Sequence, residues 1–136
     1  MNKKRLTTLM QLADGVLRPS GILKANGRIE DSYNGQTSGF SVTVAMSGLL
    51  PALVIYYQQA SESRNINRKN ILEAIGLMIS QDHDFTAVSN INNAKSLLRA
   101  AIETRNKAEN KKLKQEVIDC AIALKQIIRT YELIES

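Results

Sequence analysis

Few side chains in this sequence have the chemistry that catalysis or metal binding requires. The chain has one histidine and one cysteine, whereas enzymes usually need an activated nucleophile, a tuned acid and base pair or a metal. His83 lies in the tripeptide Asp82-His83-Asp84. A divalent ion needs more converging ligands than this loop offers, so a solvated loop is the favoured interpretation. Cys120 falls on an apolar helical stripe, where a small buried side chain is expected. We therefore expect no metal site, no cofactor and no catalytic activity.

Basic side chains are concentrated between Ile91 and Lys114. Seven Lys and Arg residues in this segment oppose Glu103 and Glu109, so the local excess of five equals the formal net charge of the whole chain, +5. Such a surface suits contacts to nucleic-acid phosphates, which depend little on base sequence. A solvated corner between two helices explains the same composition equally well.

Two isoleucines near the C-terminal end fall outside the main apolar stripe of their helix. On a helical projection Ile118 and Ile122 lie beside Lys114, Lys125 and Arg129. Apolar side chains among cations suggest a surface that another molecule covers, although a broad core explains the pattern too. We predict a protein interface at Ile118 and Ile122, and complete burial of both within the monomer would contradict it.

Helices are the elements that must position these side chains. A chain of 136 residues is long enough for one domain with a sizeable core, and its 43% hydrophobic content argues against disorder. Apolar residues at helical spacing predict an all-α, compact bundle of five to six helices that forms a single domain over residues 1–136. The first four expected helices cover residues 2–17, 32–47, 50–60 and about 68–80. A fifth helix is capped by Ser89 and carries Ile91 to Ile102. After a polar break at 106–110, the last helix runs from Leu113 to Ile134.

The N-terminus and the single cysteine indicate the cellular compartment in which the protein is expected. Basic residues precede an apolar segment in MNKKRLTTLMQLADGVL, but polar residues interrupt that segment and no small-residue cleavage site follows. One cysteine cannot form an internal disulfide, which suits a reducing compartment. We expect an amphipathic first helix and a cytoplasmic protein.

The segment from Tyr33 to Tyr57 contains no charged residue. A run this apolar must be buried against the chain's own helices, against a partner or in lipid. Its residues 41–44 alternate like a strand, but the chain offers no convincing partner strand, so we expect helices. Gly48 suits the end of the first helix and Pro51 the start of the second, which should be central to the bundle because it is apolar nearly all round.

A membrane protein is one alternative. Residues 40–57 have about the length that spans a bilayer, with tyrosines at one end. Polar and helix-breaking residues dilute this segment, and amphipathic helices elsewhere are typical of packing in water. We expect no membrane partner.

Two blocks of the sequence resemble a known family. The first is Tyr33-Asn34-Gly35, followed by Ser38, Phe40 and Ser47-Gly48-Leu49-Leu50-Pro51-Ala52 to Tyr56. The second runs from Cys120-Ala121-Ile122-Ala123-Leu124-Lys125 to Arg129-Thr130-Tyr131. Together they resemble the Cmr small-subunit family of type III-B CRISPR effector complexes. Asn34, Gln36 and Ser41 depart from the family pattern, so an RNA contact through the family's lysine after the first tyrosine is not expected here.

The resemblance implies a small, all-helical, non-catalytic protein in antiviral defence. Several copies would stack along a ribonucleoprotein built on a CRISPR guide RNA and contact the large subunit, the backbone subunits and the target RNA. Cleavage would belong to other subunits. The residues that we predict to face RNA are all basic: Lys95, Arg99, Lys107, Lys111, Lys112, Lys125 and Arg129.

A helical adaptor or DNA-binding regulator is the alternative from another class of protein. A helix-turn-helix needs a short turn that often contains glycine and a helix that reads bases. The break at 106–110 is polar but lacks that pattern. A mobility-shift comparison of single-stranded RNA with duplex DNA separates the two classes.

Overall fold

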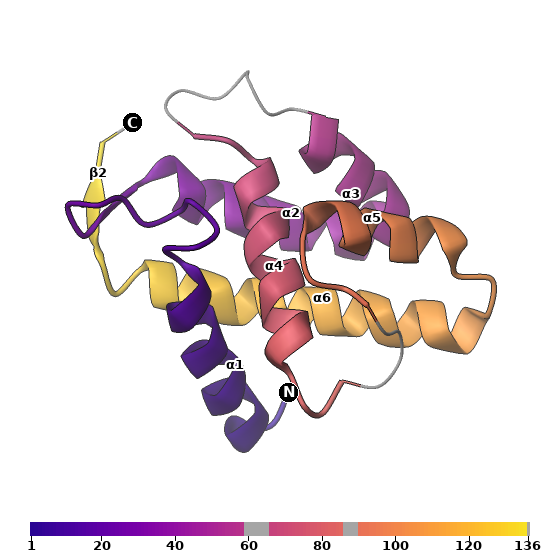
Figure 1. The fold of residues 1–136 in the computed structure, drawn as a ribbon. Helices are drawn as coiled ribbons and strands as arrows, with labels where there is room; N and C mark the ends of the chain where they lie inside the picture. Colours follow the sequence, from indigo (N-terminus) through magenta and orange to yellow (C-terminus); the bar gives the residue numbers. More distant parts are fainter. Residues whose placement is uncertain (59–65, 86–89, 136) are drawn as a thin grey trace.

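Six helices and one pair of short strands make up the described part of the chain, which comprises residues 1–58, 66–85 and 90–135 of a computed structural model (Figure 1). In chain order the elements are α1 (Lys3–Val16), β1 (Arg28–Glu30), α2 (Ser32–Ser47), α3 (Leu49–Gln58), α4 (Lys69–Gln81), α5 (Ala94–Glu103), α6 (Lys107–Ile128) and β2 (Glu132–Ile134). The predicted all-α bundle is confirmed, with a small sheet added to it.

Helix α6 crosses the width of the molecule (Figure 1). It packs against α1, α2 and α4. Its apolar stripe is buried as predicted, including Leu113, Val117, Cys120 and Leu124. This stripe therefore supplies one long wall of the core.

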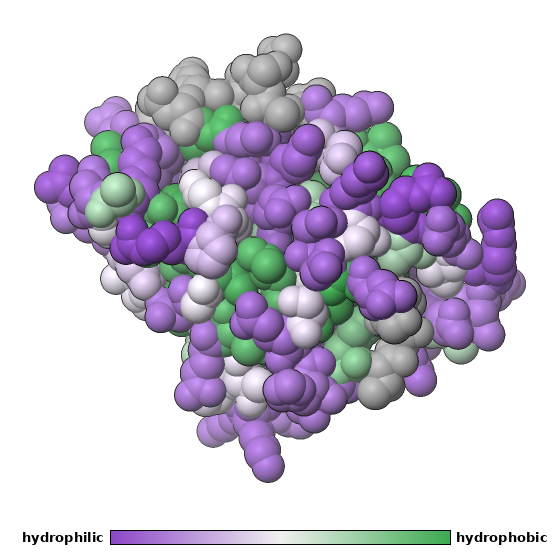
Figure 2. Space-filling model, in the orientation of Figure 1, coloured by the Kyte–Doolittle hydropathy of each residue, from purple (hydrophilic) through white to green (hydrophobic). Residues whose placement is uncertain are grey.

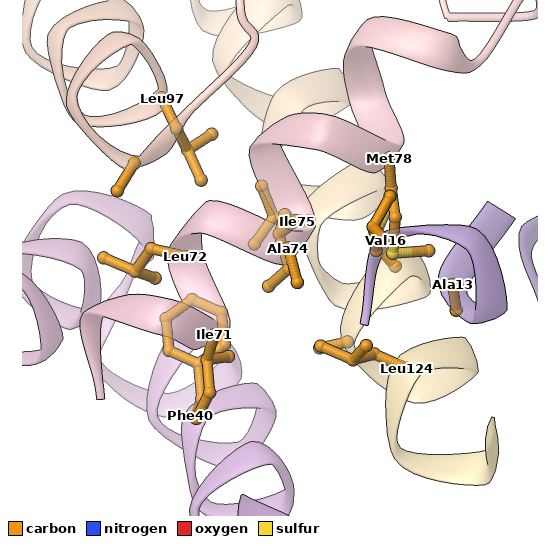
Figure 3. Close-up of a cluster of buried hydrophobic side chains, with 14 of the residues drawn as sticks. Ala13, Val16, Phe40, Ile71, Leu72, Ala74, Ile75, Met78, Leu97 and Leu124 are labelled. Atoms are coloured by element: carbon orange, nitrogen blue, oxygen red, sulfur yellow. The ribbon is translucent and has the colours of Figure 1, made fainter. Parts of the chain in front are cut away.

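Helix α4 lies at the centre of the core, in contact with α1, α3, α5 and α6. Its side chains Ile71, Leu72, Ile75 and Met78 are fully buried, and Figure 3 shows them between side chains of the surrounding helices. The close approach of α5 depends on Gly76, because a Cβ atom there would lie 2.6 Å from the carbonyl oxygen of Asn93.

The prediction that the helix after Gly48 is central to the bundle is therefore wrong. Helix α3 buries Leu49, Ala52, Leu53 and Tyr56, but it exposes Leu50 and Ile55. The uncharged segment is thus buried on its inner side only. Its helical character is confirmed, since α2 has the predicted bounds.

The proposed membrane span at 40–57 is divided between two helices. Gly48 separates them with a φ of +97°, a conformation that favours glycine. Among the residues that the structure describes, no helix has the length and apolarity to cross a bilayer.

The boundaries around α5 and α6 differ from the prediction. Asn93 caps α5 by accepting a hydrogen bond from the amide of Ser96 at 2.7 Å, and the predicted cap Ser89 lies outside the described residues. The polar break is shorter than expected, because Asn106 accepts a bond from the amide of Ala108 at 2.8 Å and starts α6 there. Capping by asparagine thus adds nearly two turns to the last helix.

The C-terminal end of the predicted last helix is wrong as well. Helix α6 ends at Ile128, and residues 132–134 form β2, which pairs in parallel with β1. Ile29 opposes Leu133 in the register, and Ile29 is fully buried. The apolar spacing at Tyr131 and Ile134 fits a helix locally, but pairing with β1 satisfies the backbone instead.

Candidate interaction surfaces

The predicted RNA-facing cations of α5 line one recess. Lys95 and Arg99 are exposed, lie one turn apart, and border a cavity of about 420 Å³ together with Asn90, Asn93, Ser96, Ala100 and Glu103. Arg99 donates a hydrogen bond to Glu103 at 2.8 Å, which offsets part of its charge. Hydrophilic side chains cover most of this region (Figure 2).

The predicted cations of α6 fall on two sides of that helix. Lys107, Lys111, Lys125 and Arg129 share one side by helical periodicity, and roughly 27 Å of helix separates Lys107 from Lys125 at 1.5 Å per residue. Lys112 points to another side and lines a second recess of about 340 Å³ with Arg5, Asp84, Phe85, Gln115, Glu116 and Asp119. The seven cations therefore occupy several neighbouring surfaces and share no single site.

Exposure of these side chains permits contact with a large ligand. Lys95, Arg99, Lys107, Lys111, Lys112 and Arg129 are exposed, and Lys125 is half-buried. Arg105, another basic residue of the segment between Ile91 and Lys114, lies in the connection between α5 and α6 and is exposed.

The two isoleucines of the predicted protein interface lie between the cation pairs on the same side of α6. Ile118 is half-buried and packs against the core, whereas Ile122 is 37% exposed. Complete burial of both, which would have contradicted the interface, is not observed. The interface itself stays a prediction.

A buried ionic cluster, which was not predicted from the sequence, joins three parts of the chain that are distant in the sequence. Arg5 of α1 donates hydrogen bonds to Asp82 Oδ1 at 2.8 Å and to Glu116 Oε1 at 2.6 Å. It also contacts Asp82 Oδ2. The side chain of Asp82 is 1% exposed and that of Glu116 is 8% exposed, so the two carboxyl groups share one guanidinium and are mostly buried.

The two carboxyl groups respond to this environment in opposite ways. Burial, reinforced by a hydrogen bond with Asp82, raises the pKa of Glu116 to about 8 although Arg5 acts against it. Burial also acts to raise the pKa of Asp82, but the hydrogen bonds, chiefly from Arg5, outweigh it and lower that pKa to about 2. Arg5 pairs with both carboxyl groups, and of the two Glu116 is the one that favours keeping a proton.

This cluster explains the Asp82-His83-Asp84 tripeptide. Asp82 binds Arg5 and also accepts a hydrogen bond from the amide of Asp84 at 3.1 Å, while His83 is exposed. Within the described residues, no group of three or more potential ligands could hold a metal ion. Cys120 is fully buried, as expected, and burial raises the pKa of its thiol. The one sequence signal for the cluster was an acidic residue, Glu116, at the edge of an apolar stripe.

The tyrosines of the first motif block are packing residues. The Tyr33 hydroxyl accepts hydrogen bonds from the Asn67 amide at 3.2 Å and from Asn70 Nδ2 at 3.0 Å. The Tyr56 hydroxyl donates to the carbonyl oxygen of Gln36 at 3.1 Å, and its ring meets that of Phe40 edge-on. These contacts connect α2 to α3 and α4, so this block maintains the fold.

The fold and these surfaces define a small helical-bundle protein whose exposed side chains include clusters of cations. Residues 20–131 match the model of one family, the CRISPR-associated protein family Cas_Cmr5. The chain belongs to this family, and the predicted resemblance to the Cmr small subunits is confirmed. No curated protein and no solved structure matches the chain. Helix α1 lies outside the matched residues, although Arg5 joins it to the matched part.

Proposed function

We propose that this chain is a non-catalytic small subunit of a type III-B Cmr ribonucleoprotein that acts in antiviral defence in the cytoplasm. In this proposal it stacks along the channel that holds guide RNA and target RNA and contacts RNA phosphates through its basic residues. Family membership supports the association with a Cmr complex. The exposed cations of α5 and of the first turns of α6 are the observation that carries the RNA contact.

The arrangement of these cations suits a phosphate backbone. Lys107 and Lys111 are one turn apart, roughly 6 Å along the axis at 1.5 Å per residue, and Lys95 and Arg99 have the same spacing on α5. Side chains on several sides of a corner follow a curved backbone and carry no base-reading geometry. Contacts of this kind hold a guide and target duplex whatever its sequence.

The protein partners in this proposal are the large subunit, the backbone subunits and further copies of this chain. Ile118 and Ile122 supply a contact for one of them, because an isoleucine that is 37% exposed beside Lys125 gains by burial against a partner. RNA phosphates are charged and do not bury an apolar side chain in this way. The isoleucines and the cations share one side of α6, so in this proposal RNA and protein contact neighbouring parts of the same side.

Charge reversal tests the RNA contact. The triple variant Arg99→Glu/Lys111→Glu/Lys112→Glu should weaken capture of single-stranded target RNA by the reconstituted complex and leave helicity unchanged, since all three side chains are exposed. The matched control is Lys3→Glu/Lys4→Glu/Arg18→Glu, which makes the same charge change at exposed residues outside the predicted surface.

The salt dependence of the same binding measures the number of phosphate contacts. About four phosphate contacts on a single strand correspond to a slope near −3 in a plot of log affinity against log salt, at roughly −0.7 per contact. The triple variant should flatten that slope by about 2, and the control variant should keep it. Equal slopes for wild type and triple variant would contradict the assignment, and stronger binding to duplex DNA would favour the regulator alternative.

A further inference from the structure

Two asparagines of the sequence, Asn26 and Asn34, are followed directly by glycine. In an asparagine-glycine pair the backbone nitrogen of the glycine can attack the side-chain carbonyl carbon of the asparagine, because the glycine has no side chain to obstruct the approach. Asparagine is accordingly one of the thermolabile residues of proteins. The fold places these two asparagines in different surroundings, so their reactivity should differ.

Asn26 lies in an exposed turn ahead of β1. The amide of Gly27 donates to the carbonyl oxygen of Lys24 at 3.0 Å, and the amide of Lys24 donates to the carbonyl oxygen of Arg28 at 2.9 Å. The side-chain oxygen of Asn26 accepts a hydrogen bond from the amide of Arg28 at 3.0 Å. This bond holds the side-chain carbonyl beside the backbone that follows it and polarises its carbon. The carbonyl that reacts is therefore positioned, activated and open to water.

Gly27 gives this turn room to change shape. Its φ is +81°, a conformation that glycine adopts without strain, and a Cβ atom placed on it would meet no atom of the described chain within 4 Å. The hydrogen bond from its amide to Lys24 must break before the nitrogen can attack. That bond lies in an exposed turn, where local opening costs little free energy.

Helix α2 protects Asn34. This residue lies near the start of the helix, and closing a ring between its side chain and the next backbone nitrogen would pull its backbone away from helical dihedral angles. The hydroxyl of the preceding residue, Tyr33, accepts hydrogen bonds from Asn67 and Asn70, so opening this turn also disrupts contacts with α4. The side-chain oxygen of Asn34 is buried, which keeps water from the carbonyl.

We propose that Asn26 is a site of spontaneous deamidation and that Asn34 is not. The Gly27 nitrogen forms a bond to Cγ of Asn26, and the side-chain nitrogen leaves as ammonia with the proton of the Gly27 amide. Water then opens the resulting succinimide at either of its carbonyl groups. One opening gives aspartate, and the other gives isoaspartate, in which the backbone runs through the side chain. This inference does not depend on the proposed function.

The two products should affect the start of β1 differently. Aspartate at position 26 keeps the oxygen that accepts the amide of Arg28, whereas isoaspartate lengthens the backbone by a methylene group and moves that oxygen. Arg28 is the first residue of β1 and lies opposite Glu132 of β2. Isoaspartate should therefore loosen this end of the strand pair, and aspartate should leave it in place.

Peptide mapping by mass spectrometry tests the site. The purified chain is kept at physiological temperature in mildly alkaline buffer, both folded and unfolded in urea, and the conversion of each side-chain amide to a carboxyl group is followed over time. In urea Asn26 and Asn34 should react at similar rates. In the folded chain Asn26 should stay within about tenfold of its rate in urea, whereas Asn34 should slow more than about a hundredfold, because its reaction requires opening of α2. An isoaspartyl methyltransferase should label the product at position 26.

Three results would overturn the inference. Protection of Asn26 in the folded chain would show that the hydrogen bond between Gly27 and Lys24 is enough to block the attack. Equal rates at Asn26 and Asn34 in the folded chain would show that the local structure does not select the site. Aspartate formed at position 26 without isoaspartate would exclude the succinimide.

Two substitutions at position 26 complete the test. Asn26→Gln should abolish the modification, because glutamine would have to close a larger ring, and modification of this variant at the same rate would contradict the mechanism. Asn26→Asp is the matched control for the effect on β1, since it carries the same added charge without the longer backbone. The amide of Arg28 should exchange its hydrogen roughly fivefold faster in the isoaspartate form than in Asn26→Asp, the effect of losing one ordinary hydrogen bond. Equal exchange in the two forms would refute the loosening of the strand pair.

Discussion

Replacing Glu116 with glutamine removes the one titration that the buried cluster places near neutral pH. Glutamine keeps the shape of the side chain and can still accept a hydrogen bond from Arg5. It cannot acquire a negative charge beside Asp82. The variant therefore separates the charge of Glu116 from its packing.

The sign of the effect follows from the shift of the pKa. The pKa of Glu116 rises from an ordinary value of 4.5 to about 8 in the folded protein, so between these values the folded state binds more protons than the unfolded state. The free energy of unfolding of the wild type must fall as the pH rises through this window. The lowered pKa of Asp82, about 2, acts in the opposite direction and only in acid: its contribution is lost as the pH falls below about 4.

The magnitude depends on how dry the site is. Full linkage would change the free energy of unfolding by about 1.4 kcal/mol per pH unit. Glu116 also lines a recess of about 340 Å³, and solvent there screens the charge, so we take about half of the full value. Wild type should then lose about 2 kcal/mol relative to Glu116→Gln between pH 5 and pH 8.

Urea unfolding followed by circular dichroism at several pH values measures this difference. Comparing each variant with wild type at the same pH cancels the titration of all other groups. Glu109→Gln is the matched control, since Glu109 is exposed on the same helix, and its difference from wild type should not change with pH in this range. A constant difference for Glu116→Gln from pH 5 to pH 8 would refute the reasoning about the cluster.

Two further predictions concern packing, and thermal unfolding measures both. Gly76→Ala should lower the free energy of unfolding by about 2 kcal/mol, because its Cβ would lie 2.6 Å from the carbonyl oxygen of Asn93 and push α5 away from α4. The control Gly15→Ala has nothing within 4 Å of its Cβ and should raise the free energy of unfolding by about 0.5–1 kcal/mol. Equal effects of the two substitutions would contradict the close approach of α5. Tyr33→Phe should lower the free energy of unfolding by about 1–2 kcal/mol, since Asn70 Nδ2 loses its acceptor in a partly buried site. An unchanged melting temperature would show that water replaces the hydroxyl.

Local patterns predicted most of the helices because each pattern was complete within its own segment. The stripe of α6 shows its periodicity without reference to any other part of the chain, whereas residues 32–47 were predicted to be helical because the rest of the chain offered no convincing partner strand. The start of α6 was placed too late because the first turns are polar, and only the cap at Asn106 marks their beginning. A search for capping residues ahead of polar turns would have found it.

Features that depend on distant contacts could not be predicted in this way. Arg5 lies 77 and 111 positions from its two acidic partners, and no spacing rule connects such residues. Strand β2 was read as helix because its partner β1 is far away in the sequence. The exposed side of α2 and α3 was missed because a lack of charge was taken to mean burial on all sides. Six of the seven predicted basic residues are exposed and Lys125 is half-buried, and their division among several surfaces could be seen only in the structure.

The parallel pair of β1 and β2 has a consequence for the order of folding. Closing a loop between positions 28 and 132 loses chain entropy before the hydrogen bonds of the strand pair can form. The helices, in contrast, form from local contacts. The strand pair should therefore form after the helices and separate first. Hydrogen exchange would reveal this at the amide of Asp31, which donates to the carbonyl oxygen of Ile134 at 2.8 Å and should lose protection before the amides of α4. Release of β2 would then be the first step by which the protein unfolds.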